Sequence, residues 1–211
     1  MPGKTRVWYL FCLAVSGKLM EFRNATRADC PAIAELALMA GEGIPAFFWE
    51  QARKAGQTLL EVGAQNAASD TENYSWRNTR LALIDNAIAG MLLAYRLPVV
   101  DPDEGLAGYP AFIRPLIELE WCVPESFYIN MLATYPAYRN RSVGTRLMEQ
   151  VDSLAGEAGC ALSSLEVFDE NTGALRLYQR LGYEVIEQRP VIPHACHPYT
   201  GEILLLTRVV G

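Results

Sequence analysis

The fold is decided by Phe127-Tyr128-Ile129-Asn130-Met131-Leu132-Ala133-Thr134 together with Tyr138-Arg139-Asn140-Arg141-Ser142-Val143-Gly144-Thr145. The first run is rich in bulky and β-branched side chains and predicts a strand. Tyr135-Pro136 ends it, and residues 145–151 have the apolar periodicity of a helix. A strand, a basic turn with small residues and a helix in succession can bind an anion, because the first N–H groups of a helix lack internal partners.

The basic turn is the predicted phosphate site. Arg139, Arg141 and Arg146 supply positive charge and forked donors, and Gly144 lets a ligand approach the backbone. An ordinary strand-to-helix connection with surface arginines is the alternative. No Gly-Lys-Ser/Thr follows, so the turn is not a Walker loop.

A second stretch repeats the strand-then-helix order. Residues 161–168 predict a strand, and Asn171, Ala174, Tyr178 and Leu181 fall on one side of the helix that follows. A polar residue at the helix start and a phenol two turns later therefore face the same way. Gly182 ends the helix.

The two stretches together carry a family resemblance. Arg139-x-x-Ser142-x-Gly144 resembles the (Gln/Arg)-x-x-Gly-x-(Gly/Ala) acyl-CoA loop of the GNAT acetyltransferases. The pattern from Leu165 through Asn171, Ala174 and Tyr178 to Gly182-Tyr183 is similar to that family's second signature. Their joint spacing covers about residues 126–185 and is far more specific than either half. Ser142 departs from the family, which usually has glycine there.

The resemblance implies a fold and a set of binding residues. The fold class would be α/β, with the GNAT fold: a mixed, mostly antiparallel central sheet whose fourth and fifth strands splay apart, flanked by helices. Pantetheine would lie along the fourth strand. The residues expected to bind acetyl-CoA, the co-substrate, are Leu132, Ala133, Thr134, Arg139, Asn140, Arg141, Ser142, Val143, Gly144, Thr145, Asn171 and Ala174.

Acyl transfer from a thioester requires three chemical tasks. A backbone N–H near Leu132 or Ala133 would polarise the carbonyl, and Tyr178 is the expected catalytic residue that protonates the leaving thiolate. Core packing is the alternative role for Tyr178, and capping its helix is the alternative or additional role for Asn171.

The group that deprotonates the incoming amine is left open. Glu118, Glu120 and Glu42 are candidates, with a solvated glutamate pair favoured for the first two. Tyr128 and Asn130 alternate onto one strand face and could line the acceptor groove.

Two other motifs are interpreted more simply. Phe47-Phe48-Trp49 favours core packing over an acceptor wall. His194-x-Cys196-His197 has no fourth ligand nearby, so no metal is expected, and this loop is predicted to shape the mouth of the acceptor site.

Composition limits the function classes. The chain has 211 residues, is 51% hydrophobic and has a net charge of −6 with a pI near 5.0. This composition supports one folded domain and argues against nucleic acid as the main partner. Five cysteines without paired spacing predict free thiols in a reducing, cytoplasmic compartment. No membrane partner is expected, and a homodimer is left open.

The rest of the chain predicts further elements in order. Residues 1–19 are an N-terminal extension, interpreted as an extra strand or an artefact, with a signal peptide as the alternative; residues 20–211 form one domain. A strand at 20–26, a capping box at Thr26–Asp29, a helix ending at Gly41 and a second helix running to about Ala68 come next. A hairpin turning at Asp85-Asn86, a loop at 98–115 and a short helix at 115–122 precede the central stretch, and strands at 183–189 and 202–209 end the chain.

The sequence thus predicts an acetyl-CoA-dependent N-acetyltransferase that transfers the acetyl group directly to a primary amine of a small molecule or peptide. No cysteine of the central stretch has a histidine at a telling spacing, so a covalent enzyme intermediate is not favoured. The alternative is a non-catalytic acyl-CoA-binding or regulatory module on the same fold.

Overall fold

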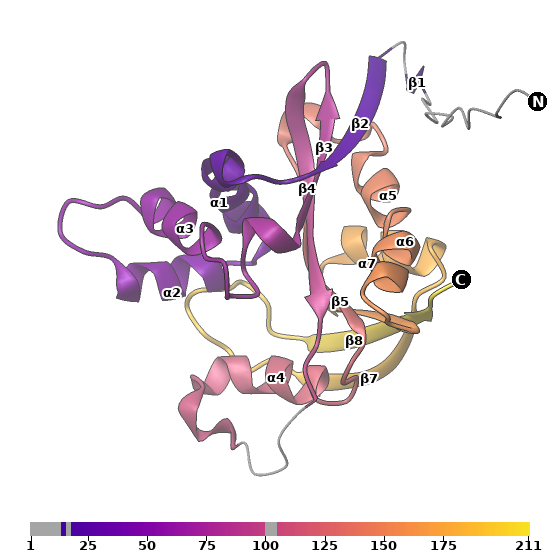
Figure 1. Ribbon diagram of the computed structural model, residues 1–211. Helices are drawn as coiled ribbons and strands as arrows, with labels where there is room; N and C mark the ends of the chain where they lie inside the picture. Colours follow the sequence, from indigo (N-terminus) through magenta and orange to yellow (C-terminus); the bar gives the residue numbers. More distant parts are fainter. Residues whose placement is uncertain (1–13, 16–17, 100–104) are drawn as a thin grey trace, which may run out of the picture.

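A computed structural model describes residues 14–15, 18–99 and 105–211 (Figure 1). Its sheet has the strand order β1-β2-β3-β4-β5-β6-β8-β7, so the last strand in the sequence lies between β6 and β7. The strands are β1 (Ala14–Val15), β2 (Lys18–Asn24), β3 (Thr79–Ile84), β4 (Ala87–Arg96), β5 (Phe127–Thr134), β6 (Leu162–Phe168), β7 (Glu184–Pro190) and β8 (Glu202–Val209). The mixed, mostly antiparallel α/β architecture predicted from the sequence is confirmed.

The one parallel pair among these strands, β5 with β6, opens part-way along. Their register runs only from Phe127 opposite Ser163 to Ile129 opposite Leu165. Beyond that point β5 stays paired with β4 as far as Thr134, and β6 stays paired with β8 as far as Phe168. Counted from β2, β5 and β6 are the fourth and fifth strands, the pair predicted to splay.

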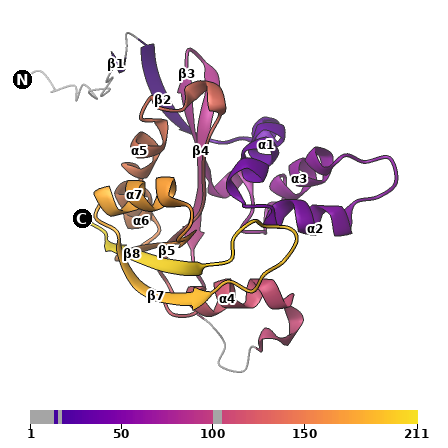
Figure 2. The same cartoon turned by 180° about the vertical axis from the view of Figure 1, so that it is seen from behind.

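The helices lie in three groups around the sheet (Figures 1 and 2). Their bounds are α1 (Cys30–Ala40), α2 (Ile44–Ala52), α3 (Leu59–Ala67), α4 (Arg114–Glu120), α5 (Val143–Met148), α6 (Val151–Glu157) and α7 (Thr172–Arg180). Helices α1 to α3 pack on strand residues such as Leu81, Met91 and Ala133. Helices α5 to α7 pack on the alternate residues, including Ala82 and Leu92, so they cover the opposite face.

Helix α4 shares a face with α1 to α3. Its Leu119 packs with Tyr128, Phe168 and Leu205, whose sequence neighbours Ile129, Val167 and Leu206 contact the α5–α7 group instead. Because successive strand residues alternate faces, the two core clusters beneath α1–α3 and α4 lie side by side on one face. The splay between β5 and β6 opens between them.

Turn chemistry explains several boundaries. Asp85 and Asn86 both have positive φ, 52° and 63°, as a two-residue hairpin turn with the right-handed twist of its strands requires. The predicted capping box is present, since Asp29 accepts hydrogen bonds from the N–H and the hydroxyl of Thr26 at 2.7 and 2.8 Å. Gly41 ends α1 as predicted.

The expectation of one helix running to about Ala68 is wrong. Helix α2 ends at Ala52, and α3 begins only at Leu59. Between them Gly56 has a φ of 84°, and Thr58 forms a new capping box with Glu61 that starts α3. Apolar residues resume at Leu59, Leu60 and Val62 directly after this box, which is why the apolar pattern suggested one continuous helix.

Only part of the N-terminal extension at residues 1–19 lies within the described residues. β1 pairs with β2 through Ala14 opposite Leu19, whereas residues 1–13 and 16–17 lie outside the described part of the chain. Within the described residues, no helix is both long and apolar enough to cross a membrane.

Candidate active site

A cavity of about 1140 Å³ lies on the α1–α4 face, above the splay. Its floor is formed by β5 and by the end of β6. One wall comes from α1, α2 and the loop after α3, and the other from α4 and the segment before it. Floor residues include Tyr128, Asn130, Leu132, Glu166 and Phe168; wall residues include Met39, Phe48, Asn66, Glu72, Tyr74, Ile113, Leu116 and Glu120.

The splay exposes backbone donors on β5. Tyr135 N–H donates to the Ala89 carbonyl of β4 at 2.9 Å. Donors alternate along an extended strand, so Ala133 also directs its N–H toward β4. The N–H groups of Leu132 and Thr134 then point to the side that β6 has left. Of the three strand residues predicted to hold acetyl-CoA, these two present a backbone donor to the cleft.

The basic turn after β5 has the backbone strain typical of an anion-binding loop. Asn140 and Ser142 have φ of 60° and 61°, and Ser142 is the residue before α5. Between Asn140 and Thr145, no backbone N–H bonds to another described residue. The Arg139, Asn140 and Arg141 side chains are exposed, with Arg141 over the Tyr138 ring at 5.8 Å. Free N–H donors and exposed guanidinium groups fit a diphosphate.

The left-handed φ of Ser142 explains why the resembling family favours glycine at this position. A non-glycine residue there is strained. Gly144 is helical, and a Cβ added to it would make ordinary contacts with the Leu177 and Leu132 side chains at 3.7 and 3.8 Å. The two small-residue positions therefore differ, because the first requires a left-handed backbone and the second would accept a Cβ without a clash.

Helix α7 brings its predicted residues to the cleft. Asn171, Ala174 and Tyr178 all line the cavity. Asn171 caps α7, since its Oδ1 accepts from Ala174 N–H at 3.3 Å, and its Nδ2 donates to Glu42 at 2.9 Å. The Tyr178 ring packs in the core of the α5–α7 face, and burial followed by the charge of Glu42 raises the pKa of its hydroxyl. The phenol therefore stays protonated at neutral pH.

Two half-buried carboxyls line the cavity, one on its floor and one on its wall. Glu166 of β6 accepts a hydrogen bond from the Tyr128 hydroxyl at 3.3 Å, and its Oε1 is fully buried without a partner. Glu120, the last residue of α4, lines the same region. Burial, then the charge of Glu120, raises the pKa of Glu166 well above its ordinary value, and burial raises that of Glu120 to about 7.

The structure separates the two glutamates that the sequence suggested were a solvated pair. Glu118 is solvated and pairs with Arg189 at 3.2 Å, but Glu120 turns into the cavity, so the solvated interpretation is wrong for Glu120. Glu166 was missed. The sequence does offer one indication of Glu166, because it is a carboxyl between Leu165 and Val167 in a largely apolar strand, where a charge is costly to bury. Tyr128 and Asn130 both line the cavity. The simple alternation expected of them is interrupted, because the β4–β5 register shifts between Leu93 and Ala94, opposite Asn130.

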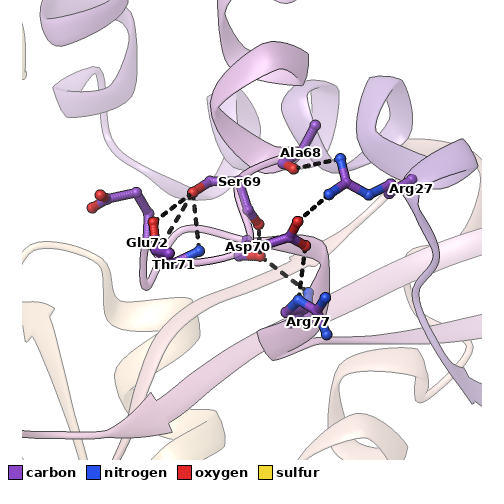
Figure 3. Close-up of polar contacts among 8 residues, drawn as sticks. Arg27, Ala68, Ser69, Asp70, Thr71, Glu72 and Arg77 are labelled. Carbon is purple, nitrogen blue, oxygen red and sulfur yellow. Dashed lines mark hydrogen bonds and ion pairs between the residues drawn. The ribbon is translucent and has the colours of Figure 1, made fainter.

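The outer wall of the cavity is a loop held by ion pairs (Figure 3). Asp70 pairs with Arg27, before α1, and with Arg77 Nε at 2.9 Å. Both guanidinium groups lie over the Trp76 ring, at 5.9 and 4.6 Å. The Ser69 hydroxyl accepts from Thr71 N–H and Glu72 N–H at 3.2 and 3.1 Å. This network orients the loop side chains that line this end of the cavity.

Aromatic residues both line this wall and support it from behind. Phe48 and Trp49 line the cavity, and Phe47 makes edge contacts with Phe112 and His194 at 4.9 and 5.1 Å. The loop with His194 and His197 packs on Phe112 and Phe168, so it supports residues around the cavity without lining it. Among the described residues no group of three His, Cys, Asp or Glu is placed to hold a metal ion.

Comparison with known proteins assigns this arrangement to a family. A sequence model of the Acetyltransferase (GNAT) family matches residues 45–183, from α2 to the end of α7. The chain belongs to the GNAT acetyltransferase family.

Individual relatives and structures are more distant. An uncharacterized protein of Mycobacterium leprae is 35% identical over 85 residues, 40% of this chain and 22% of that protein. The thialysine N-epsilon-acetyltransferase of Mus musculus is 28% identical over 100 residues, 46% of this chain and 57% of the relative. The matches thus span less than two thirds of these relatives. A polyamine N-acetyltransferase of Drosophila melanogaster shares the GNAT fold, with a TM-score of 0.62 and 18% identity over 90% of this chain and 99% of that one.

Proposed function

We propose that this GNAT protein is an acetyl-CoA-dependent N-acetyltransferase that acts by direct transfer to a primary amine of a small cationic molecule. The observation that carries the proposal is that one opening joins both substrates' sites. The splay beyond Ile129 and Leu165 connects the free N–H groups of β5 and the start of α7 to a cavity with carboxyls on its floor. A thioester entering between β5 and β6 would meet an amine held in that cavity.

The chain's own groups suit the coenzyme part of this reaction. The free N–H groups and arginines of residues 139–145 would hold the diphosphate, and the Leu132 or Thr134 N–H would polarise the thioester carbonyl. Tyr178, the proposed catalytic acid, would donate its proton to the leaving sulfur. Acetyl-CoA supplies the activated acetyl group.

The lining of the cavity supports a cationic acceptor. Glu42, Glu72, Glu120 and Glu166 line it, and none of its described lining residues is Lys, Arg or His. Unbalanced negative charge attracts ammonium groups. The Mus musculus relative is named for thialysine, and structural neighbours for agmatine and polyamines, all of which are cationic amines. The acceptor class we propose is therefore a small molecule with a primary amine and a positive charge.

Release of free coenzyme A thiol tests the function. Purified protein is incubated with acetyl-CoA and a panel comprising thialysine, agmatine, 1,4-diaminobutane, neutral-side-chain amino acids and a peptide with a free N-terminus. The cationic small amines are expected to release thiol fastest, with mass spectrometry showing one added acetyl group.

The alternative is a non-catalytic acyl-CoA-binding module, and the strained Ser142 in the basic turn is consistent with it. Acetyl-CoA binding by calorimetry without thiol release from any amine of the panel would favour that module. Binding of ATP in place of acetyl-CoA would reject both functions.

A further inference from the structure

We propose that the free edge of β7 is a dimer interface. A second copy of this chain would add its own β7 antiparallel to the first, with the two copies of Gln188 opposite each other. The strand order ends at β7, so among the described residues this strand has a neighbour, β8, on one side only. An exposed strand edge presents backbone groups that can pair with another chain. No residue of β7 lines the cavity, so this surface does not depend on the acyl-transfer chemistry.

The strand β7 is exposed along nearly its whole length. Six of its seven residues are exposed, and Arg189 is half-buried. Apolar side chains lie on it, because Val185 and Ile186 are 43% and 51% exposed and Ile192, two residues after the strand, is 39% exposed. Exposed apolar residues gathered on an unpaired sheet edge favour a contact with another protein chain.

Backbone hydrogen bonds show which groups of β7 point outward. Val191 N–H donates to the Gly201 carbonyl at 2.9 Å, so Val191 faces the β8 side. Backbone groups alternate in direction along an antiparallel strand, so Arg189 also faces β8, whereas Gln188 faces away from it. The contacts of Gln188 agree with this direction. Its N–H donates to Glu187 Oε1 at 3.0 Å, and its carbonyl accepts from the Arg189 guanidinium at 2.7 Å.

The charges on β7 select one register for a two-fold dimer. With Gln188 opposite its copy, each Gln188 N–H would donate to the carbonyl of the other, as in a hydrogen-bonded antiparallel pair. The same register sets Glu187 of each copy opposite Arg189 of the other. Two-fold axes beside Glu187 or Arg189 would instead set like charges directly opposite, which destabilises strand pairing.

Forming this pair exchanges one set of contacts for another. In the single chain the Glu187 carboxylate and the Arg189 guanidinium cover the backbone groups of Gln188 and approach each other to 3.1 Å. In the dimer these side chains would pair across the interface, and reciprocal backbone bonds would replace the local ones. Exposed ion pairs contribute little, so their release costs little. Ile186 would lie opposite Pro190 of the second copy, and burial of this apolar surface favours association.

Two features limit the pairing to a closed dimer. The β7–β8 register shifts between Val185 and Glu187, which marks a bulge at Ile186, and Pro190 has no N–H to donate. Bulges and prolines at an edge prevent pairing from extending along the strand. The two-fold contact also uses the β7 edge of both copies, so it produces a dimer and not an open fibre.

Sedimentation velocity of the full chain over about a hundredfold range of concentration tests the interface. The wild type is expected to show a monomer–dimer equilibrium. Arg189→Glu and Glu187→Arg each set like charges opposite each other and should raise the dimer dissociation constant at least about tenfold. The double variant, Glu187→Arg with Arg189→Glu, restores unlike charges across the interface and should recover most of the affinity. Circular dichroism of all three variants checks that β7 remains folded.

Cysteine cross-linking tests the register. Opposed residues of a hydrogen-bonded antiparallel pair have Cα atoms about 5.5 Å apart, which is within the range of a disulfide. In a Cys122→Ser background, which removes an exposed thiol, Gln188→Cys should form a covalent dimer under mild oxidation at least about tenfold faster than Glu184→Cys. Glu184→Cys is the matched control, because residue 184 is exposed on the same strand but lies opposite Ile192 of the second copy in this register.

The outcomes separate this dimer from other arrangements. A wild type that stays monomeric at every concentration would overturn the proposal, as would charge variants that dimerise like the wild type. A double variant as weak as the single ones would show that charge pairing does not hold the interface. Cross-linking of Glu184→Cys as fast as that of Gln188→Cys would exclude the proposed register and with it the proposal.

Discussion

The basic turn at residues 139–145 and the carboxyl pair Glu120–Glu166 are opposite kinds of site. The turn is a continuous, exposed segment of the chain whose donors are backbone N–H groups and guanidinium groups. The pair joins two residues 46 positions apart (166 − 120), on a helix and a strand, and the Oε1 atom of Glu166 is shielded from solvent. One site is local in sequence and strongly hydrated; the other exists only after folding.

This difference predicts how each site responds to change. An exposed turn holds a charged ligand through many weak and partly screened contacts, so single substitutions there have modest effects. A buried pair has few contacts in a medium of low dielectric, so each is worth more and its protonation is coupled to stability. The following predictions test this contrast from the largest expected effect to the smallest.

Tyr178→Phe removes the hydroxyl that we propose protonates the leaving thiolate. We expect kcat to fall by about 100-fold or more, because loss of a positioned proton donor typically costs 10²–10⁴-fold. The dissociation constant of acetyl-CoA, measured by calorimetry, should change little. If kcat stays within about threefold of the wild type, Tyr178 is a packing residue.

Glu120→Gln tests the cost of the buried pair. Burial raises the pKa of Glu120 to about 7 in the folded protein, above that of the unfolded chain. The folded protein therefore binds more protons, and the wild type loses stability as the pH rises from about 4.5 to 7. Relative to the wild type, the variant should gain about 1–3 kcal/mol in unfolding free energy over this range. Urea unfolding at pH 4.5 and pH 7 measures it, with Glu118→Gln as the control; an equal pH slope in all three proteins would contradict the burial argument.

Ser142→Gly relieves the left-handed backbone at the phosphate turn. A non-glycine residue at a φ of 61° is strained, whereas glycine adopts it freely. Part of the gain is offset by the greater freedom of glycine in the unfolded chain, so we expect roughly 0.5–1 kcal/mol of added stability. The KM for acetyl-CoA should fall a few-fold, since the hydroxymethyl group no longer crowds the diphosphate. Ser142→Ala, which keeps the strain, should show no gain in thermal unfolding.

Asp70→Asn loosens the loop of Figure 3. Asp70 is about two-fifths exposed, so its ion pairs with Arg27 and Arg77 contribute roughly 0–1 kcal/mol. The KM for the amine should rise at most about fivefold, with kcat and the KM for acetyl-CoA unchanged. Steady-state kinetics with each substrate varied in turn distinguishes this from a change on the coenzyme side.

Sequence reasoning succeeded where the information is local. Local residues, within a few positions of one another, set the strand 127–134, the basic turn, the capping box at Thr26, the N-cap at Asn171 and the hairpin at Asp85-Asn86. Local propensity and turn chemistry act over that range. The splay was expected from the family resemblance, and it appears where the β5–β6 register stops.

By itself, the sequence determined the α/β class and the family, and it predicted the residues that would bind the coenzyme. Only the tertiary structure decided which carboxyls line the cavity. α4 turns Glu120 inward and Glu118 outward, and β6 brings Glu166 to the hydroxyl of Tyr128. The physical reason is that burial and the proximity of like charges depend on how helices and strands pack, whereas a strand, a turn or a cap depends mainly on its own residues.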